Sequence, residues 1–163
     1  MSDPHPPSAA STRTMTRPGI LMRPLVTQAD FERTLALLAA LHAPIDIGTL
    51  RIRLAALQDA GWQGIGVFRA IDGALLALAG CQVRLCLAHG HCLCVDHFVV
   101  TEAMRGVGVG SDLLAHLAQM ARRRGCARLI LDAALTDGAA LGFWSRRGFS
   151  ASGVQFAMAL PAR

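Results

Sequence analysis

Lysine, asparagine and tyrosine are missing from this 163-residue chain. All three have A/T-rich codons, so a GC-rich coding bias is the simplest common cause, and a single arginine need not be a functional choice. The lack of lysine excludes the phosphate loop of NTPases, which requires Gly-Lys followed by Ser or Thr. Although 53% of the residues are hydrophobic, no apolar run is long enough to cross a bilayer. We therefore expect no membrane partner.

Acidic residues are outnumbered: sixteen basic residues, all arginine, face eleven Asp and Glu, a net charge of +5. Nucleic acid or a multiply phosphorylated cofactor would suit such a balance. The basic residues form no long stripe, and their one cluster, residues 122–124, falls at a predicted helix C-terminus, where cations complement the helix dipole. We therefore expect no nucleic-acid partner.

The five cysteines are an odd number, and no secretory signal precedes them. We therefore expect reduced thiols in a cytoplasm.

The first eighteen residues have the composition of a disordered tail rather than of a targeting signal. They hold prolines among Ser, Thr and Ala: Pro4, Pro6, Pro7 and Pro18. The remainder, residues 19–163, is the length of one ordinary domain. The chain thus divides into a tail over 1–18 and a domain over 19–163.

The domain opens with a strand and two helices. Residues 20–25 form an apolar segment that reads as an edge strand, because Pro24 cannot donate to a ladder. Thr27 followed by Asp30 predicts a capping-box helix start, and Asp46 can cap a second helix.

Strands dominate the next part of the chain. The apolar period changes to two, Asp72-Gly73 is a hairpin signal, and three antiparallel strands are expected at 64–71, 74–87 and 91–100. A short apolar strand over 128–132 is typical of the buried middle of a sheet. Thr136 or Asp137 caps a last helix, and 153–160 is the final strand. The order β-α-α-β-β-β-α-β-α-β predicts an α+β fold in an α/β-type three-layer arrangement, with a mixed, mostly antiparallel sheet flanked by helices.

A glycine-rich stretch, RGVGVGSD at residues 105–112, lies between an apolar strand and a helical pattern. Strand, glycine loop and helix together build an anion site, because backbone N–H groups and the helix dipole point at one spot. The dinucleotide fingerprint does not fit, since position 111 is Ser where a third glycine is needed. The pattern that fits is R-x-x-G-x-G, from Arg105, Gly108 and Gly110. We therefore predict a ligand with a diphosphate group.

Three blocks in this order resemble the GNAT superfamily of acyl-CoA N-acyltransferases: VDHFVV at 95–100, the glycine loop, and LD followed by FWSRRGF at 143–149. The resemblance runs over about residues 20–160. It implies transfer of an acetyl group from acetyl-CoA to a primary amine of a small molecule or peptide by direct attack. It also implies which residues contact the cofactor: Phe98, Val99, Val100, Arg105, Gly106, Val107, Gly108, Val109, Gly110, Ser111, Phe143 and Arg146.

The resemblance further implies the catalytic groups. A backbone N–H near Val99 or Val100 would stabilise the oxyanion. Asp96 is the expected base or amine-binding group, because period two places it on one face with Phe98 and Val100, and that position often faces the acceptor in the family. His97, on the opposite face, is the competing base.

One residue departs from the family pattern. Trp144 stands where the family usually has a Tyr that protonates the leaving thiolate, and an indole is not a practical acid. Either the enzyme works without this acid, since a thiol with a pKa of about 8.5 is a fair leaving group, or the chain is a weak or inactive acyl-CoA-binding or sensory module. We expect a cytoplasmic, bacterial N-acetyltransferase.

The acceptor itself is not specified by the sequence. Residues 41–57 and 133–138 are expected to shape its pocket. The sequence does not fix the oligomeric state, and a homodimer is compatible with it. No metal is expected, because His91 and His97 would lie about 20 Å apart along an extended strand and no second ligand pair accompanies Cys92 and Cys94.

Overall fold

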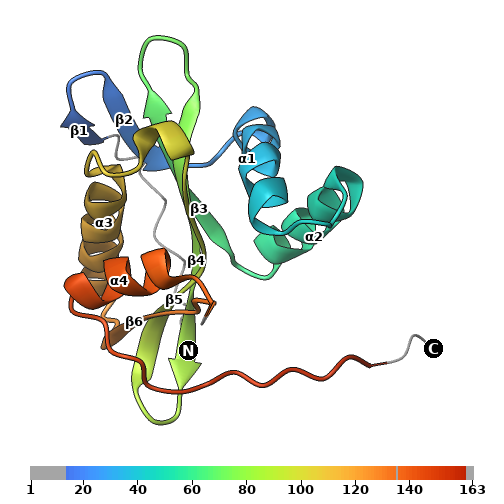
Figure 1. Cartoon of the computed structure of the whole chain (residues 1–163), viewed down its shortest axis with the longest axis vertical. Coiled ribbons are helices and arrows are strands. Elements are labelled where there is room, and N and C mark those ends of the chain that lie inside the picture. The colour runs from blue at the N-terminus through green and yellow to red at the C-terminus, as the bar shows by residue number, and fades with distance from the viewer. Residues whose placement is uncertain (1–13, 135, 161–163) are drawn as a thin grey trace, which may run out of the picture. The chain divides into compact units, whose positions relative to one another are not determined.

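The computed structural model describes residues 14–134 and 136–160 (Figure 1). The chain divides into two compact units, residues 1–131 and 132–163, and each is described by itself. Most of the tail expected at 1–18 lies outside the described residues.

The first unit is built on one six-stranded sheet in the order β1-β2-β3-β4-β5-β6. All neighbouring strands are antiparallel except β5 and β6, which are parallel. The mixed, mostly antiparallel sheet of an α+β fold is therefore confirmed. The strands are β1 (Thr14–Arg17), β2 (Ile20–Pro24), β3 (Gln63–Arg69), β4 (Leu75–Cys86), β5 (Gly90–Val100) and β6 (Arg128–Leu131).

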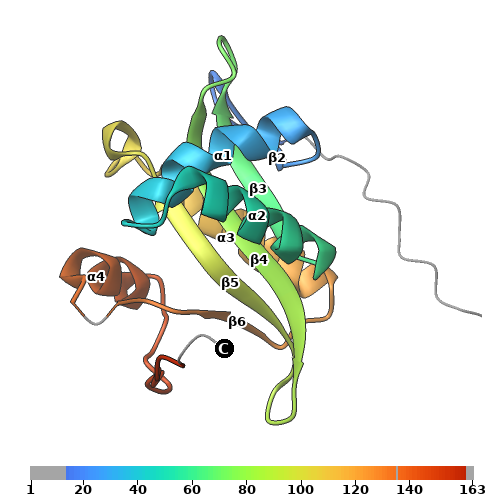
Figure 2. The ribbon, with the colours of Figure 1, turned by 90° about the vertical axis from the view of Figure 1, so that its right-hand side faces the viewer.

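Helices cover both faces of this sheet. Helices α1 (Gln28–Leu41) and α2 (Ile47–Asp59) lie on one face, and α3 (Val109–Arg123) lies on the other (Figures 1 and 2). Two hydrophobic clusters follow from this layering, one beneath α3 and one beneath α1 and α2. The first unit thus has the expected three layers.

The N-terminal end of the sheet differs from the sequence prediction. Thr14–Arg17 form β1, which pairs with β2, so these four residues are in a strand rather than a tail. Because β1 covers one side of β2, β2 is an internal strand and not an edge. Pro24 lies beyond the last β1 partner, at Met22, so its missing N–H removes no bond on that side.

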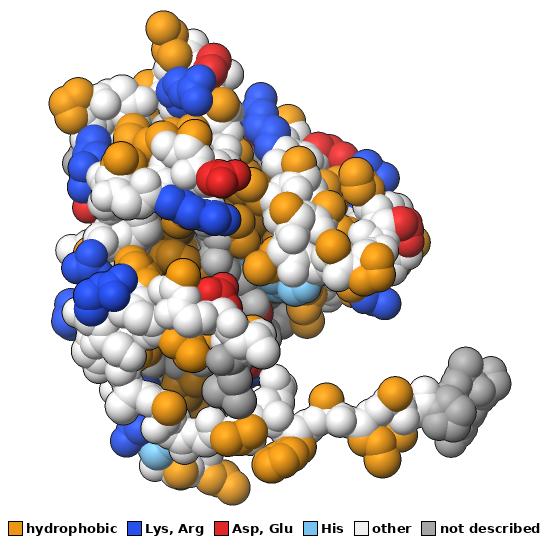
Figure 3. All heavy atoms as spheres, in the orientation of Figure 1, with side chains coloured by type: hydrophobic (Ala, Val, Ile, Leu, Met, Phe, Trp, Pro, Cys, Tyr) orange, Lys and Arg blue, Asp and Glu red, His pale blue; other side chains and the backbone are white. Residues whose placement is uncertain are grey.

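The second unit contains helix α4 (Gly138–Arg146), capped by Asp137 as expected. The strand predicted over 153–160 is wrong: the structure has no strand at these residues. Their apolar side chains are 63–93% exposed (Figure 3): Val154, Phe156, Met158 and Leu160. The alternation matches a strand, but a strand needs a ladder partner, and the described part of this unit holds no other strand.

The position of β6 in the first unit also differs from the prediction. This strand was expected in the middle of the sheet, but it lies at the edge.

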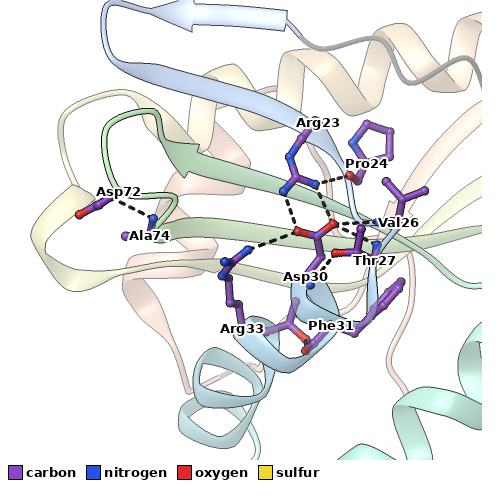
Figure 4. A network of polar contacts seen from close by, with 10 residues as sticks. Arg23, Pro24, Val26, Thr27, Asp30, Phe31, Arg33, Asp72 and Ala74 are labelled. Carbon is purple, nitrogen blue, oxygen red and sulfur yellow. Dashed lines mark hydrogen bonds and ion pairs between the residues drawn. The ribbon is translucent and has the colours of Figure 1, made fainter.

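A buried carboxylate ties β2 to α1 (Figure 4). Asp30 is 1% exposed, and its two oxygens accept hydrogen bonds of 2.6 and 2.8 Å from the Arg23 guanidinium. Its backbone N–H donates to the Thr27 hydroxyl, and its carboxylate accepts from the Thr27 N–H, which is the predicted capping box. Arg23 holds the pKa of Asp30 well below its usual range.

We expect Asp30→Asn to lower the free energy of unfolding by about 1–3 kcal/mol, because it leaves Arg23 without its charged partner. The folded state holds fewer protons on Asp30 than the unfolded state does. The contribution is therefore present above the ordinary carboxyl pKa of about 4 and is lost as pH falls below it. Urea unfolding between about pH 6 and pH 3 measures this; equal pH dependence in both proteins would contradict it. Asp59→Asn, at an exposed carboxylate, is the control.

Candidate functional site

The glycine loop leads directly into α3. A short 3-10 turn, Glu102–Met104, follows β5, and Gly108 is the N-cap of α3 with no side-chain hydrogen bond. Gly106 and Gly108 have φ of 74° and 93°, in the left-handed region that side chains rarely adopt. The first N–H groups of a helix have no acceptor within the helix, and a glycine cap contributes no oxygen to them. The loop therefore has the backbone of an anion site.

Arginines flank this loop on two sides. Arg17 on β1 donates from Nε to Asp112 at 2.6 Å, and its guanidinium lies so close to Gly108 that a Cβ there would collide with it. Arg105 donates from Nε to the Val100 carbonyl at 3.3 Å, which ties the loop to the end of β5. Sequence reasoning found Arg105 but missed Arg17, because it assigned β1 to the tail.

The ladder between β5 and β6 covers only part of β5. The pairs run from Cys92↔Arg128 to Val95↔Leu131, and β6 ends there. Beyond Val95, β5 continues to Val100 beside β4 alone among the strands that the structure describes. The GNAT resemblance implies that these two strands separate and that the pantetheine arm of the cofactor lies between them, and the end of β6 at Leu131 agrees with that.

A β-bulge decides which way the candidate catalytic side chains point. Opposite Gly80 and Cys81 on β4 stand His97 and Val95, so Asp96 is the extra residue. A bulge of this kind breaks the period-two alternation. Leu93, Val95, Phe98 and Val100 consequently all belong to the cluster beneath α3.

The predicted face of Asp96 is therefore wrong. Strict alternation places Asp96 with Phe98 and Val100, but these two pack toward α3, whereas Asp96 contacts Arg84. His97, its neighbour, lines a cavity under α1 and α2. The register against β4, which is not visible in the local sequence, accounts for the difference.

One carboxylate oxygen of Asp96 accepts a hydrogen bond, and the other does not. Oδ1 accepts from the Arg84 guanidinium at 2.9 Å, and the side chain is 23% exposed. Oδ2 is buried and has no hydrogen-bond partner among the described residues. Such an atom is a candidate acceptor for a ligand proton.

His97 is enclosed by aromatic side chains. Its ring packs edge to face on His42, at 5.1 Å between centroids, and on Trp62, at 6.0 Å. Burial, reinforced by the nearby His42, lowers the pKa of His97 below its ordinary value. The imidazole is therefore neutral at neutral pH and can accept a proton. His42, just after α1, was not singled out in the sequence.

The second unit carries the remaining predicted residues on α4. Trp144 is buried and packs edge to face on Phe143 and Phe149, at 4.8 and 5.3 Å between centroids. Arg146 also lies on this helix. The predicted cofactor contacts of Phe143 and Arg146 and the predicted catalytic position of Trp144 stay predictions.

The His and Cys residues of β5 are of the types that ligate metals. No group of three or more His, Cys, Asp or Glu among the described residues is arranged to hold a metal ion. All five cysteines are free thiols.

Comparison with known proteins adds a family to this geometry. A model described as "Acetyltransferase (GNAT) family" matches residues 38–149, which is more than half of the chain. The chain belongs to the GNAT acetyltransferase family. The sequence resemblance is thereby confirmed, and membership supports acyltransferase activity. No curated protein matches.

Many solved structures share this GNAT fold. A Trypanosoma brucei acetyltransferase is 24% identical, with a TM-score of 0.71 over 86% of this chain and 99% of its own. An aminoglycoside acetyltransferase from an uncultured soil metagenomic sample is 14% identical, with a TM-score of 0.76 over 88% and 98%. AAC(6')-Iy, bound to a CoA-containing bisubstrate analog, is 16% identical, with a TM-score of 0.70 over 88% and 99%. At these sequence identities, the likeness to the three structures shows the fold alone.

Among the described residues, none of the helices has the length and apolar character of a membrane span.

Proposed function

We propose that this GNAT protein transfers an acetyl group from acetyl-CoA to a primary amine by direct attack, without a covalent enzyme intermediate. The observation that carries the proposal is the glycine-capped start of α3, where Gly106 and Gly108 put no side chain over the loop backbone and the Arg17 guanidinium lies beside Gly108. Family membership adds the acyl-CoA chemistry, and a structural neighbour binds a CoA-containing analog.

The cofactor contacts that we propose in the first unit are these. Loop N–H groups from Gly106 to Ser111 would hold the diphosphate, and the part of β5 beyond its ladder with β6 would accompany the pantetheine arm. The acetyl-CoA thioester supplies an activated acyl group. The N–H of Val99 or Val100 is the proposed donor to the oxyanion that forms when the amine attacks.

Asp96 is the proposed base that removes a proton from the amine, with His97 as the competing group. Both residues stand at the bulge in β5, and each has a buried polar atom without a partner: Oδ2 in Asp96 and Nδ1 in His97. A free acceptor atom is what a proton-accepting group requires.

The role of Trp144 rests on its place in the sequence, where the family usually has Tyr. If solvent or the low basicity of the thiolate replaces the missing acid, Trp144→Tyr restores a phenol and should raise kcat by about tenfold where chemistry limits turnover. Steady-state kinetics with acetyl-CoA and one amine measures this. Trp144→Phe is the matched control and should change kcat little; a large loss in both variants would show that the indole itself is required.

The alternative is an acyl-CoA-binding or sensory module of the same fold, which the Trp at position 144 specifically favours. Calorimetric titration with acetyl-CoA and turnover on a panel of amines separate the two. Binding with no turnover on any amine would favour the module. We further propose a cytoplasmic protein of bacterial origin; the free thiols support the cytoplasmic location.

A further inference from the structure

A mainly aliphatic cavity of about 130 Å³, open to the surface, lies between α1, α2 and β5 of the first unit. Three of its eight lining residues are polar, namely His42, Arg53 and His97. The other five are aliphatic: Leu38, Ile45, Leu50, Leu54 and Leu57. In Figure 3 a histidine side chain is visible among hydrophobic ones at the lower edge of the block that α1 and α2 form. The wall of the cavity is therefore almost wholly apolar, with the two histidine rings packed into it.

We infer that this cavity binds the apolar part of the acceptor, so that the acceptor is a primary amine on a small hydrocarbon group such as an aromatic ring or a branched alkyl chain. The inference rests on the proposed function, which requires an acceptor. An apolar cavity of about 150 Å³ is large enough for benzene, so this one suits a group of that size. Burying such a group is favourable in proportion to its apolar area.

Two unpartnered ring nitrogens mark where the amine would lie. Nε2 of His42 and Nδ1 of His97 are buried and have no hydrogen-bond partner among the described residues, and their ring centroids are 5.1 Å apart. Leaving buried polar atoms unsatisfied is unfavourable, and we infer that small turns of the two rings bring these nitrogens to a ligand N–H. His97 also stands two residues before Val99, one of the proposed oxyanion donors.

Charge separates this acceptor class from amino sugars with several ammonium groups. None of the eight lining residues is acidic, and Arg53 is the charged one. Asp46, which lies within the residues expected to shape the acceptor pocket, is engaged as the predicted cap of α2 through Thr49. A polycation needs carboxylates to replace its hydration. The cavity therefore favours a compact apolar amine over a polycation.

Benzylamine, ethanolamine and the polycation kanamycin are the probes. Ligand-detected NMR measures binding without turnover, and release of free CoA measures turnover. Benzylamine should bind about tenfold more tightly than ethanolamine and should show the highest kcat/KM. Leu57→Phe, which fills the cavity, should weaken benzylamine binding by about tenfold. Ile52→Phe on the same helix is the matched control, because Ile52 is 73% exposed and does not line the cavity.

Two results would overturn the inference: a kcat/KM for kanamycin equal to or above that for benzylamine, or the same benzylamine affinity in Leu57→Phe and Ile52→Phe. Benzylamine binding that Leu57→Phe abolishes, without acetyl transfer to any amine, would support the cavity as an apolar-amine site and contradict the proposed function. The two claims therefore fail separately.

Discussion

Asp96→Asn is expected to lower kcat/KM by about 10²–10⁴, the usual loss when a general base is removed. The amide keeps the size of the side chain, but it cannot take the proton that the unpartnered Oδ2 is placed to accept. Initial rates across pH, at saturating acetyl-CoA, measure the effect. Asp59→Asn, at an exposed carboxylate on α2, controls for loss of one charge.

Near-normal kcat/KM for Asp96→Asn across pH would rule out Asp96 and point to His97 or a water chain. His97→Gln then becomes the decisive variant. Because burial lowers the pKa of His97, a mechanism that uses His97 stays active below the ordinary histidine pKa of about 6.5. The rate of such a mechanism falls only when the pH falls through the lowered pKa of His97. Loss of that acidic limb in His97→Gln would assign the base to His97.

Gly108→Val is expected to weaken CoA binding by about 100-fold, or about 2.7 kcal/mol. The residue has φ of 93°, a Cβ there would meet the Arg17 guanidinium, and a β-branched side chain is strongly disfavoured in this region. Calorimetric titration with CoA measures the loss. Gly125→Val is the matched control, because Gly125 has φ of 68° and open space around it after the far end of α3. Unchanged affinity in Gly108→Val would contradict the diphosphate assignment.

Local chemistry explains what the sequence could predict. The caps of α1, α2 and α4 were predicted because an N-cap depends on a few adjacent residues, such as Thr27 with Asp30. The Asp72-Gly73 hairpin was predicted for the same reason: Asp72 accepts from the N–H of Ala74, and Gly73 has φ of 68°. The glycine loop, too, is contiguous in the sequence.

Features that depend on distant pairing could not be predicted. The face of Asp96 is set by a bulge against Gly80 and Cys81 of another strand, and alternation alone cannot show an extra residue. Arg17 reaches the glycine loop because β1 pairs with β2. The expectation that residues 41–57 shape an acceptor pocket stays a prediction. The contact of His42 with His97 could not be predicted, because it requires α1 to pack on β5.

At residues 153–160 the local pattern predicted a strand that the structure does not have. Its pattern has the period of a strand, and propensity alone favours that structure. The ladder that would complete a strand is absent in the described part of its unit. Period specifies which side chains share a face, whereas pairing depends on a partner that the segment itself does not contain.

The most direct test of acetyl transfer follows the acetyl group itself. The full chain is incubated with acetyl-CoA carrying ¹³C in the acetyl group and with a panel of primary amines, and the products are analysed by mass spectrometry while free CoA thiol is measured. Acetyl transfer predicts that at least one amine gains the labelled acetyl group, with one thiol released for each amide formed. Saturable CoA binding with no labelled amine on the whole panel would contradict it.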